Sequence, residues 1–170
     1  MSTLEFAPTG FFQMRNYAIA RDGVPVGEIQ CGRMRTSAAI TMNGKSYTGA
    51  REGLISGPIY LEGSGQRLAS AVVASALKGG FKVEAGGRTF TLARASAWGR
   101  SFALTENGVQ VGSIVRRGFF SSKSTADFPD NLAPEIQAFL IWLLILIWQR
   151  QVMMAGLIGV TGAIGAGAGR

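Results

Sequence analysis

The residue types that most often perform catalysis or bind metals are scarce in this chain. Its 170 residues include no histidine, a single cysteine at Cys31, and ten acidic residues that form no close sequence cluster. Histidine is the commonest general base and metal ligand, and a lone cysteine can form neither an internal disulfide nor a cysteine zinc cluster. We therefore expect a protein that is not an enzyme and that uses no cofactor or metal.

Basic residues are the remaining candidates for a binding site, since the formal net charge is +7. They gather after two similar segments of the chain: Arg33 and Arg35 follow the first, and Arg116, Arg117 and Lys123 follow the second. Arginine forks match the geometry of phosphate groups, so these residues are candidates for an anion or lipid head-group patch. The alternative is that they are edge-strand charges that oppose aggregation.

A nucleic-acid site is a further reading of the positive charge. The stretch "RRGFFSSK" at residues 116–123 begins like an RNA-binding motif but departs from it at Phe120 and Ser122. We therefore do not expect nucleic acid as a partner.

The C-terminal tail, residues 151–170, has a composition of its own. Residues 152–169 carry no charge, and Gly156, Gly159, Gly162 and Gly165 recur at every third position. On a helix these glycines form a stripe that a lipid chain or a partner helix can approach closely, so they are candidates for membrane or partner-helix contact. A disordered apolar tail is the alternative, since many glycines destabilise a helix in water.

Residues 11–128 have the pattern of short strands separated by glycine turns. Asp22-Gly23, Asn43-Gly44 and Asn107-Gly108 supply the positive φ of tight hairpins, and apolar residues alternate with polar ones between the turns. About ten to twelve strands fit, which predicts a closed barrel or a sandwich because a flat sheet leaves edges open. The stretch "LASAVVASALKGG" also has helix-forming residues, and we interpret it as a strand. Residues 1–10 are predicted to be an extension that precedes the barrel.

Two segments repeat each other without a gap. "YAIARDGVPVGEI" at residues 17–29 aligns with "FALTENGVQVGSI" at residues 102–114. In both, the apolar face changes parity after the second glycine, which predicts β-bulges at Gly27 and Gly112. The repeat indicates a pseudo-symmetric barrel. The alternative is that two unrelated hairpins share this pattern because hairpin turns favour the same residues.

The run at residues 138–148 is apolar throughout. As a helix it is only ~16 Å long, whereas a bilayer core needs ~30 Å. A helix that is apolar on every side must be surrounded, so a central helix at about residues 132–150 is predicted to lie inside the barrel.

The glycine-turned strands, the two "G-V-x-V-G-x-I" hairpins and the following "FPDNLAPEIQAFLIWLLILIW" resemble the tubby C-terminal-like superfamily. That superfamily includes tubby domains, phospholipid scramblases and LURP-one-related proteins. The resemblance covers about residues 11–150 and implies a closed antiparallel barrel, typically of twelve strands, around a hydrophobic helix near the C-terminus.

Tubby domains bind phosphatidylinositol bisphosphate, and scramblases are associated with lipid movement and calcium. No stretch of this chain matches the phosphoinositide-contacting residues position by position, and Asp127 and Asp130 are too few for a calcium cage. The resemblance thus implies a fold and not a site.

Together these features lead us to expect a mostly β, single-domain barrel that binds anionic phospholipid or docks peripherally on a membrane. One alternative is a structural subunit that its glycine-rich tail fixes to a partner complex or bilayer, and another is a scramblase-like lipid transporter. The first residues lack a basic segment followed by an apolar one, so we expect a cytoplasmic protein that can associate with membranes and is not secreted.

Overall fold

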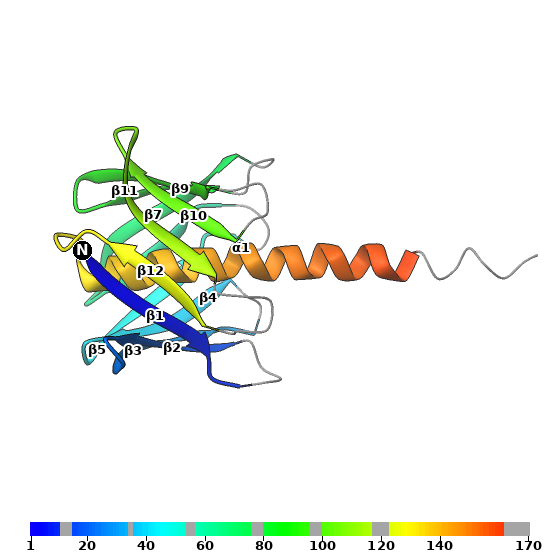
Figure 1. Ribbon diagram of the computed structural model, residues 1–170, viewed down its shortest axis with the longest axis horizontal. Helices are drawn as coiled ribbons and strands as arrows, with labels where there is room; N and C mark the ends of the chain where they lie inside the picture. Colours follow the sequence, from blue (N-terminus) through cyan, green and yellow to red (C-terminus); the bar gives the residue numbers. More distant parts are fainter. Residues whose placement is uncertain are drawn as a thin grey trace, which may run out of the picture.

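The computed structural model describes residues 1–10, 15–33, 36–53, 57–75, 80–95, 100–116 and 123–161. Its architecture is a closed antiparallel β-barrel with one C-terminal helix, α1, through its centre (Figure 1). This confirms the predicted fold class. The strands are β1 (Ser2–Pro8), β2 (Asn16–Arg21), β3 (Val24–Cys31), β4 (Ser37–Met42), β5 (Lys45–Arg51), β6 (Ile59–Gly63), β7 (Gln66–Ser75), β8 (Gly80–Ala85), β9 (Arg88–Arg94), β10 (Ser101–Glu106), β11 (Val109–Arg116) and β12 (Ser124–Phe128).

The first strand differs from the sequence prediction. Residues 1–10 were expected to lie outside the barrel, but β1 pairs with β12 on one side and with β2 on the other, and so closes the barrel. Leu4 and Phe6 alternate with Thr3 and Glu5, which places both apolar side chains in the core. In the stretch for which a helix was the alternative, residues 68–75 belong to strand β7, as predicted, and residues 76–79 lie outside the described residues.

Tight turns occupy one end of the barrel, which we call the turn end. Each has two central residues with positive φ, which glycine, Asn and Asp tolerate best. The turns are Asp22-Gly23, Asn43-Gly44, Ser64-Gly65, Gly86-Gly87 and Asn107-Gly108. At the other end, which we call the mouth, the chain leaves β1, β3, β5, β7, β9 and β11.

The predicted bulges at Gly27 and Gly112 are confirmed to within one residue. Register shifts in the β2–β3 and β10–β11 pairs leave Val26 and Val111 as the extra residues, directly before the two glycines. A Cβ atom at Gly27 would lie 2.5 Å from the carbonyl oxygen of Thr41, so only glycine fits where the bulge presses against the next strand.

The structure also contains a third copy of the repeated hairpin. Residues 59–71, "IYLEGSGQRLASA", have the same two-residue turn and the same register shift, with Leu68 as the extra residue. The copies begin at Tyr17, Ile59 and Phe102, so they are almost evenly spaced along the chain, and each copy opens a unit of four strands. The last unit is β10, β11, β12 and β1, and its final strand therefore comes from the start of the chain.

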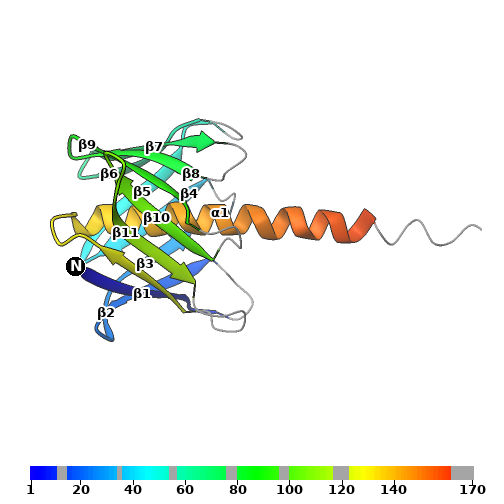
Figure 2. The same ribbon diagram turned by 45° about the horizontal axis from the view of Figure 1, so that its top comes forward.

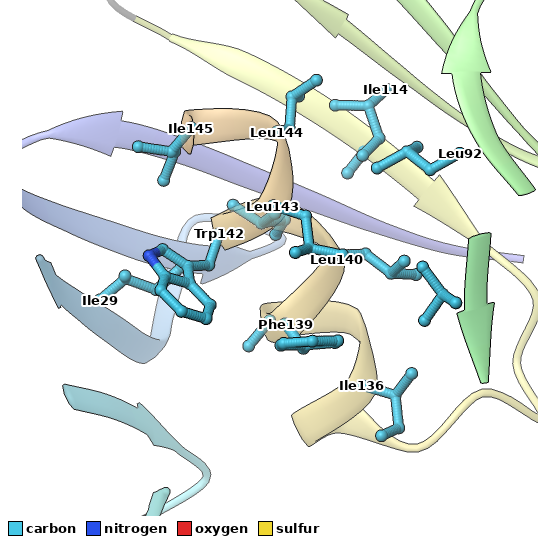
Figure 3. Packing of buried hydrophobic residues seen from close by; sticks show 14 of the residues in the cluster. Ile29, Leu92, Ile114, Ile136, Phe139, Leu140, Trp142, Leu143, Leu144 and Ile145 are labelled. Carbon is cyan, nitrogen blue, oxygen red and sulfur yellow. The ribbon is translucent and has the colours of Figure 1, made fainter. Parts of the chain in front are cut away.

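The helix α1 (Pro134–Thr161) occupies the core of the barrel. All side chains from Ala138 to Ile147 are buried, as expected for a run that has no polar face. Figure 3 shows Ile29 beside Trp142, and Leu92 and Ile114 on the side of the helix where Leu140 and Leu144 lie. The largest of these side chains, Trp142, fits because β5 has Gly49 at the contact: a Cβ atom there would overlap the indole ring.

The helix is longer than the predicted span of residues 132–150. It ends at Thr161, and its second half projects beyond the mouth along the axis of the barrel (Figures 1 and 2). Within the part of the chain whose side chains are described, no helix combines the length and apolar character that crossing a membrane requires.

Candidate functional site

The mouth carries arginines at positions that continue the inward-facing side of the strands. Side chains of a strand alternate between its two faces, so a residue two positions beyond a core residue shares its face. Six described arginines at the mouth stand in this relation to core positions. One is Arg33, two positions beyond Cys31 at the end of β3, and we call the other five the arginine ring. The ring consists of Arg15, Arg51, Arg94, Arg100 and Arg116. Each lies two positions along the chain from a buried residue, which is Tyr17, Gly49, Leu92, Phe102 and Ile114 respectively.

Strand register supports this placement. Arg51 pairs with buried Ile59, and Arg94 pairs with buried Phe102. Arg116 pairs with buried Ser124. The ring therefore forms the layer directly above the apolar core, at the level where α1 leaves the barrel.

The helix contributes Trp148 and Arg150 to the same level. The Trp148 ring stacks on Phe6 with centroids 6.0 Å apart and planes inclined by 15°. The guanidinium carbon of Arg116 lies 5.3 Å from the centre of the Trp148 ring, within the range of a cation–π contact. Arg150 is exposed and is the first charged residue after the buried run. The Trp148 ring thus covers the mouth end of the apolar core, and the guanidinium group of Arg116 lies beside it.

Arg51 is the most enclosed member of the arginine ring. Burial lowers the pKa of its guanidinium, because water stabilises the charged form less there, and the nearby positive charge of Arg150 lowers it further. The charges of Arg51 on β5 and Arg150 on α1 are therefore near enough to affect each other. An anionic group between them would relieve this repulsion.

Acidic groups are few at the mouth. Among the described residues of the segments that connect the strands there, Glu52 is the one acid, and its Oε1 accepts a hydrogen bond of 2.8 Å from Arg67. At the turn end the arrangement differs. Arg88 donates two hydrogen bonds of 2.7 Å to the Glu106 carboxylate, which raises the pKa of Arg88 and lowers that of Glu106.

An open groove on the outer wall lies between the pairs just described. It is lined by residues of β7 to β9, including Arg67, Glu84, Arg88 and the Gly86-Gly87 turn. Both of its arginines already bind carboxylates of the chain. The positive charges of these two arginines are therefore partly neutralised.

Three residues of the predicted anion patch lie at the mouth, Arg116 and Lys123 at the ends of the paired strands β11 and β12 and Arg33 after the more distant β3. Arg33, Arg116 and Lys123 are exposed at the mouth, whereas Arg35 and Arg117 lie outside the described residues. Gly156 and Gly159 belong to the helical backbone of α1, and Gly162 and Gly165 lie outside the described residues.

Sequence reasoning did not find Arg15, Arg51, Arg94, Arg100 and Arg150. The first four come from different strand ends, so no sequence cluster marks them. The sequence pattern could have revealed these four arginines. Each of the four lies two residues from an apolar or glycine core position, on the side away from the tight turn.

The mouth offers cations and hydrogen-bond donors but no group of metal ligands. Within the described residues, no three acidic or cysteine side chains are grouped closely enough to hold a metal ion. Such a set of arginines is suited to binding phosphate or carboxylate groups.

Comparison with known proteins adds no relative: no family model, curated protein or solved structure matches this chain.

Proposed function

We propose that this protein is a non-enzymatic barrel that binds the anionic surface of a membrane through its mouth. The observation that carries the proposal is the arginine ring around the exit of α1, with Arg33, Lys123 and Arg150 beside it. Guanidinium groups arranged around one rim can meet many lipid phosphates at once, whereas a soluble anion engages only a few of them.

The expected affinity follows from the number of charges. Each Lys or Arg near an anionic surface contributes about 1 kcal/mol, so several at one level give useful binding without a deep pocket. Exposed charges are screened within ~10 Å at 0.1 M salt, and binding should therefore weaken as salt is added.

Vesicle co-sedimentation tests the proposal. The full chain should pellet with anionic vesicles, made of phosphatidylcholine with phosphatidylserine as the minor lipid. The bound fraction should fall with lower phosphatidylserine content or higher salt. Vesicles of phosphatidylcholine alone are the control. Equal binding to both compositions, or no binding to either, would refute the proposal.

We also propose that the chain is a distant member of the tubby C-terminal-like superfamily. The twelve antiparallel strands and the central hydrophobic helix support this assignment, because they are the arrangement that the sequence resemblance implies. The assignment concerns the fold, and the membrane proposal stands on the arginines of this chain alone.

A structural subunit held by its C-terminal segment is the second candidate. It is favoured by the continuation of α1 to Thr161, beyond Gln149, which is the last buried residue among those whose side chains are described. Cell fractionation separates the two. Partial or complete release from membranes by salt indicates head-group binding, whereas co-purification with one protein at fixed stoichiometry in the absence of lipid indicates the subunit.

A further inference from the structure

We propose that residues 151–161 of α1 insert into a single leaflet of the bilayer, so that the barrel stands upright with its mouth on the membrane. This inference rests on the proposed function and adds a second kind of contact, with acyl chains, and a fixed orientation.

The length of the projecting helix fits one leaflet. After Arg150, the helix continues from position 151 to Thr161. At 1.5 Å per residue this segment extends ~16 Å, and half of a ~30 Å hydrocarbon core is ~15 Å. The helical segment is therefore long enough to fill one leaflet and too short to reach the opposite surface.

The distribution of charge along α1 marks a boundary at the mouth. Arg150 is followed by no charged residue until Arg170. A helix in hydrocarbon satisfies its own backbone groups, and an uncharged segment adds no cost of burying charge. In water the glycines of this segment would weaken the helix, whereas hydrocarbon favours internal backbone hydrogen bonds.

The boundary at Arg150 lies at the same level of the barrel as residues that are suited to the membrane interface. Trp148 lies at the mouth with the Arg116 guanidinium against its ring. Tryptophan concentrates at the level of lipid head groups, and arginine binds their phosphates. Insertion of the segment after Arg150 therefore places Trp148 and the arginine ring at head-group level.

The common axis of helix and barrel fixes the orientation. α1 leaves through the centre of the mouth in both views (Figures 1 and 2). If the projecting helix enters the leaflet along the membrane normal, arginines on all sides of the mouth meet the surface together. A barrel lying on its side would remove most of them from the lipid phosphates.

Quenching by brominated lipids tests the inference with the full chain. The anionic vesicles contain phosphatidylserine and phosphatidylcholine that is brominated either near the head group or near the chain ends. Trp98 is replaced by Phe in every variant, and buried Trp142 serves as an internal unquenched standard. One variant keeps Trp148, a second has Trp148→Phe, and a third has Trp148→Phe with Leu157→Trp.

In the third variant, the tryptophan introduced at position 157 should lose at least about half of its emission to deep bromines. Trp148 should respond mainly to shallow bromines, and the variant that keeps only Trp142 should not respond. In addition, Leu157→Glu should leave a barrel that binds only by charge and is fully extracted by salt.

The outcomes separate this inference from the proposed function. If the variants pellet with anionic vesicles in a salt-sensitive way but Leu157→Trp shows no quenching, insertion is wrong and surface binding stands. If Leu157→Trp is quenched but Trp148 is not quenched by shallow bromines, the upright orientation is wrong. If nothing pellets with anionic vesicles, both the inference and the proposed function fall.

Discussion

At the turn end, Arg88 connects three parts of the chain. Its guanidinium holds both oxygens of Glu106 on β10, and its Nη1 lies 3.4 Å from the Asn131 side-chain oxygen just before α1. Arg88 therefore connects the residues that precede α1 to strands β9 and β10 of the barrel wall.

The Arg88–Glu106 pair should make stability depend on acid. Hydrogen bonding to Arg88 lowers the pKa of the Glu106 carboxyl in the folded state, so its contribution is present above the ordinary glutamate pKa and is lost as pH falls through the lowered value. Glu106→Gln should therefore be less stable than the wild type at pH 7, and the difference should shrink toward pH 3. Urea unfolding at both pH values measures this, and a difference independent of pH would contradict it.

Gly49 leaves the space in the core that the Trp142 ring occupies. Because an added Cβ would overlap the indole, Gly49→Ala should destabilise the barrel by about 1–3 kcal/mol. The same substitution should cost much less in a Trp142→Leu background, since the smaller side chain leaves room. Denaturant unfolding of the four proteins in this cycle gives the coupling, and additive effects would show that the two residues do not compete for space.

Among the elements, α1 has two parts with different surroundings. Its first part is enclosed by strands, and Gln149 is the last of its described residues to be buried. Truncation after Gln151 should therefore leave the free energy of unfolding within about 0.5 kcal/mol of the wild type. Truncation after Leu143 is the control, since it removes buried Leu144 to Ile147 and should prevent folding. Unfolding of the longer truncation would show that residues beyond 151 belong to the core.

The elements were predictable where one local pattern determined them. The all-round apolar run predicts an enclosed helix, and a parity change after a turn predicts a bulge. The end of α1 was missed because the apolar composition continues through the glycines without a stop signal. β1 was missed because it ends at Pro8 and pairs with β12, which lies near the other end of the chain.

The whole molecule determines what no local pattern shows. The middle hairpin copy has Ser64-Gly65 at its turn and Ala69 where the other two copies have glycine. Its similarity to those copies is therefore recognised only from the register shift that all three share. The arginine ring likewise exists only after closure, since its members come from β2, β5, β9, β10 and β11 or the residues next to them. The clusters at Arg33 and at Arg116 revealed the charge of the mouth but not its circular arrangement.

The most direct test of the central claim compares two variants of equal net charge. Arg94→Gln/Arg116→Gln removes two charges at the mouth. Lys45→Gln/Lys82→Gln removes two exposed charges elsewhere, one at the start of β5 beside the turn end and one on β8. At about 1 kcal/mol per residue, the mouth variant should bind the phosphatidylserine-containing vesicles about thirtyfold more weakly than the wild type. The control should lose only a few-fold at most. Equal losses in vesicle co-sedimentation would contradict a site at the mouth and reduce binding to overall charge.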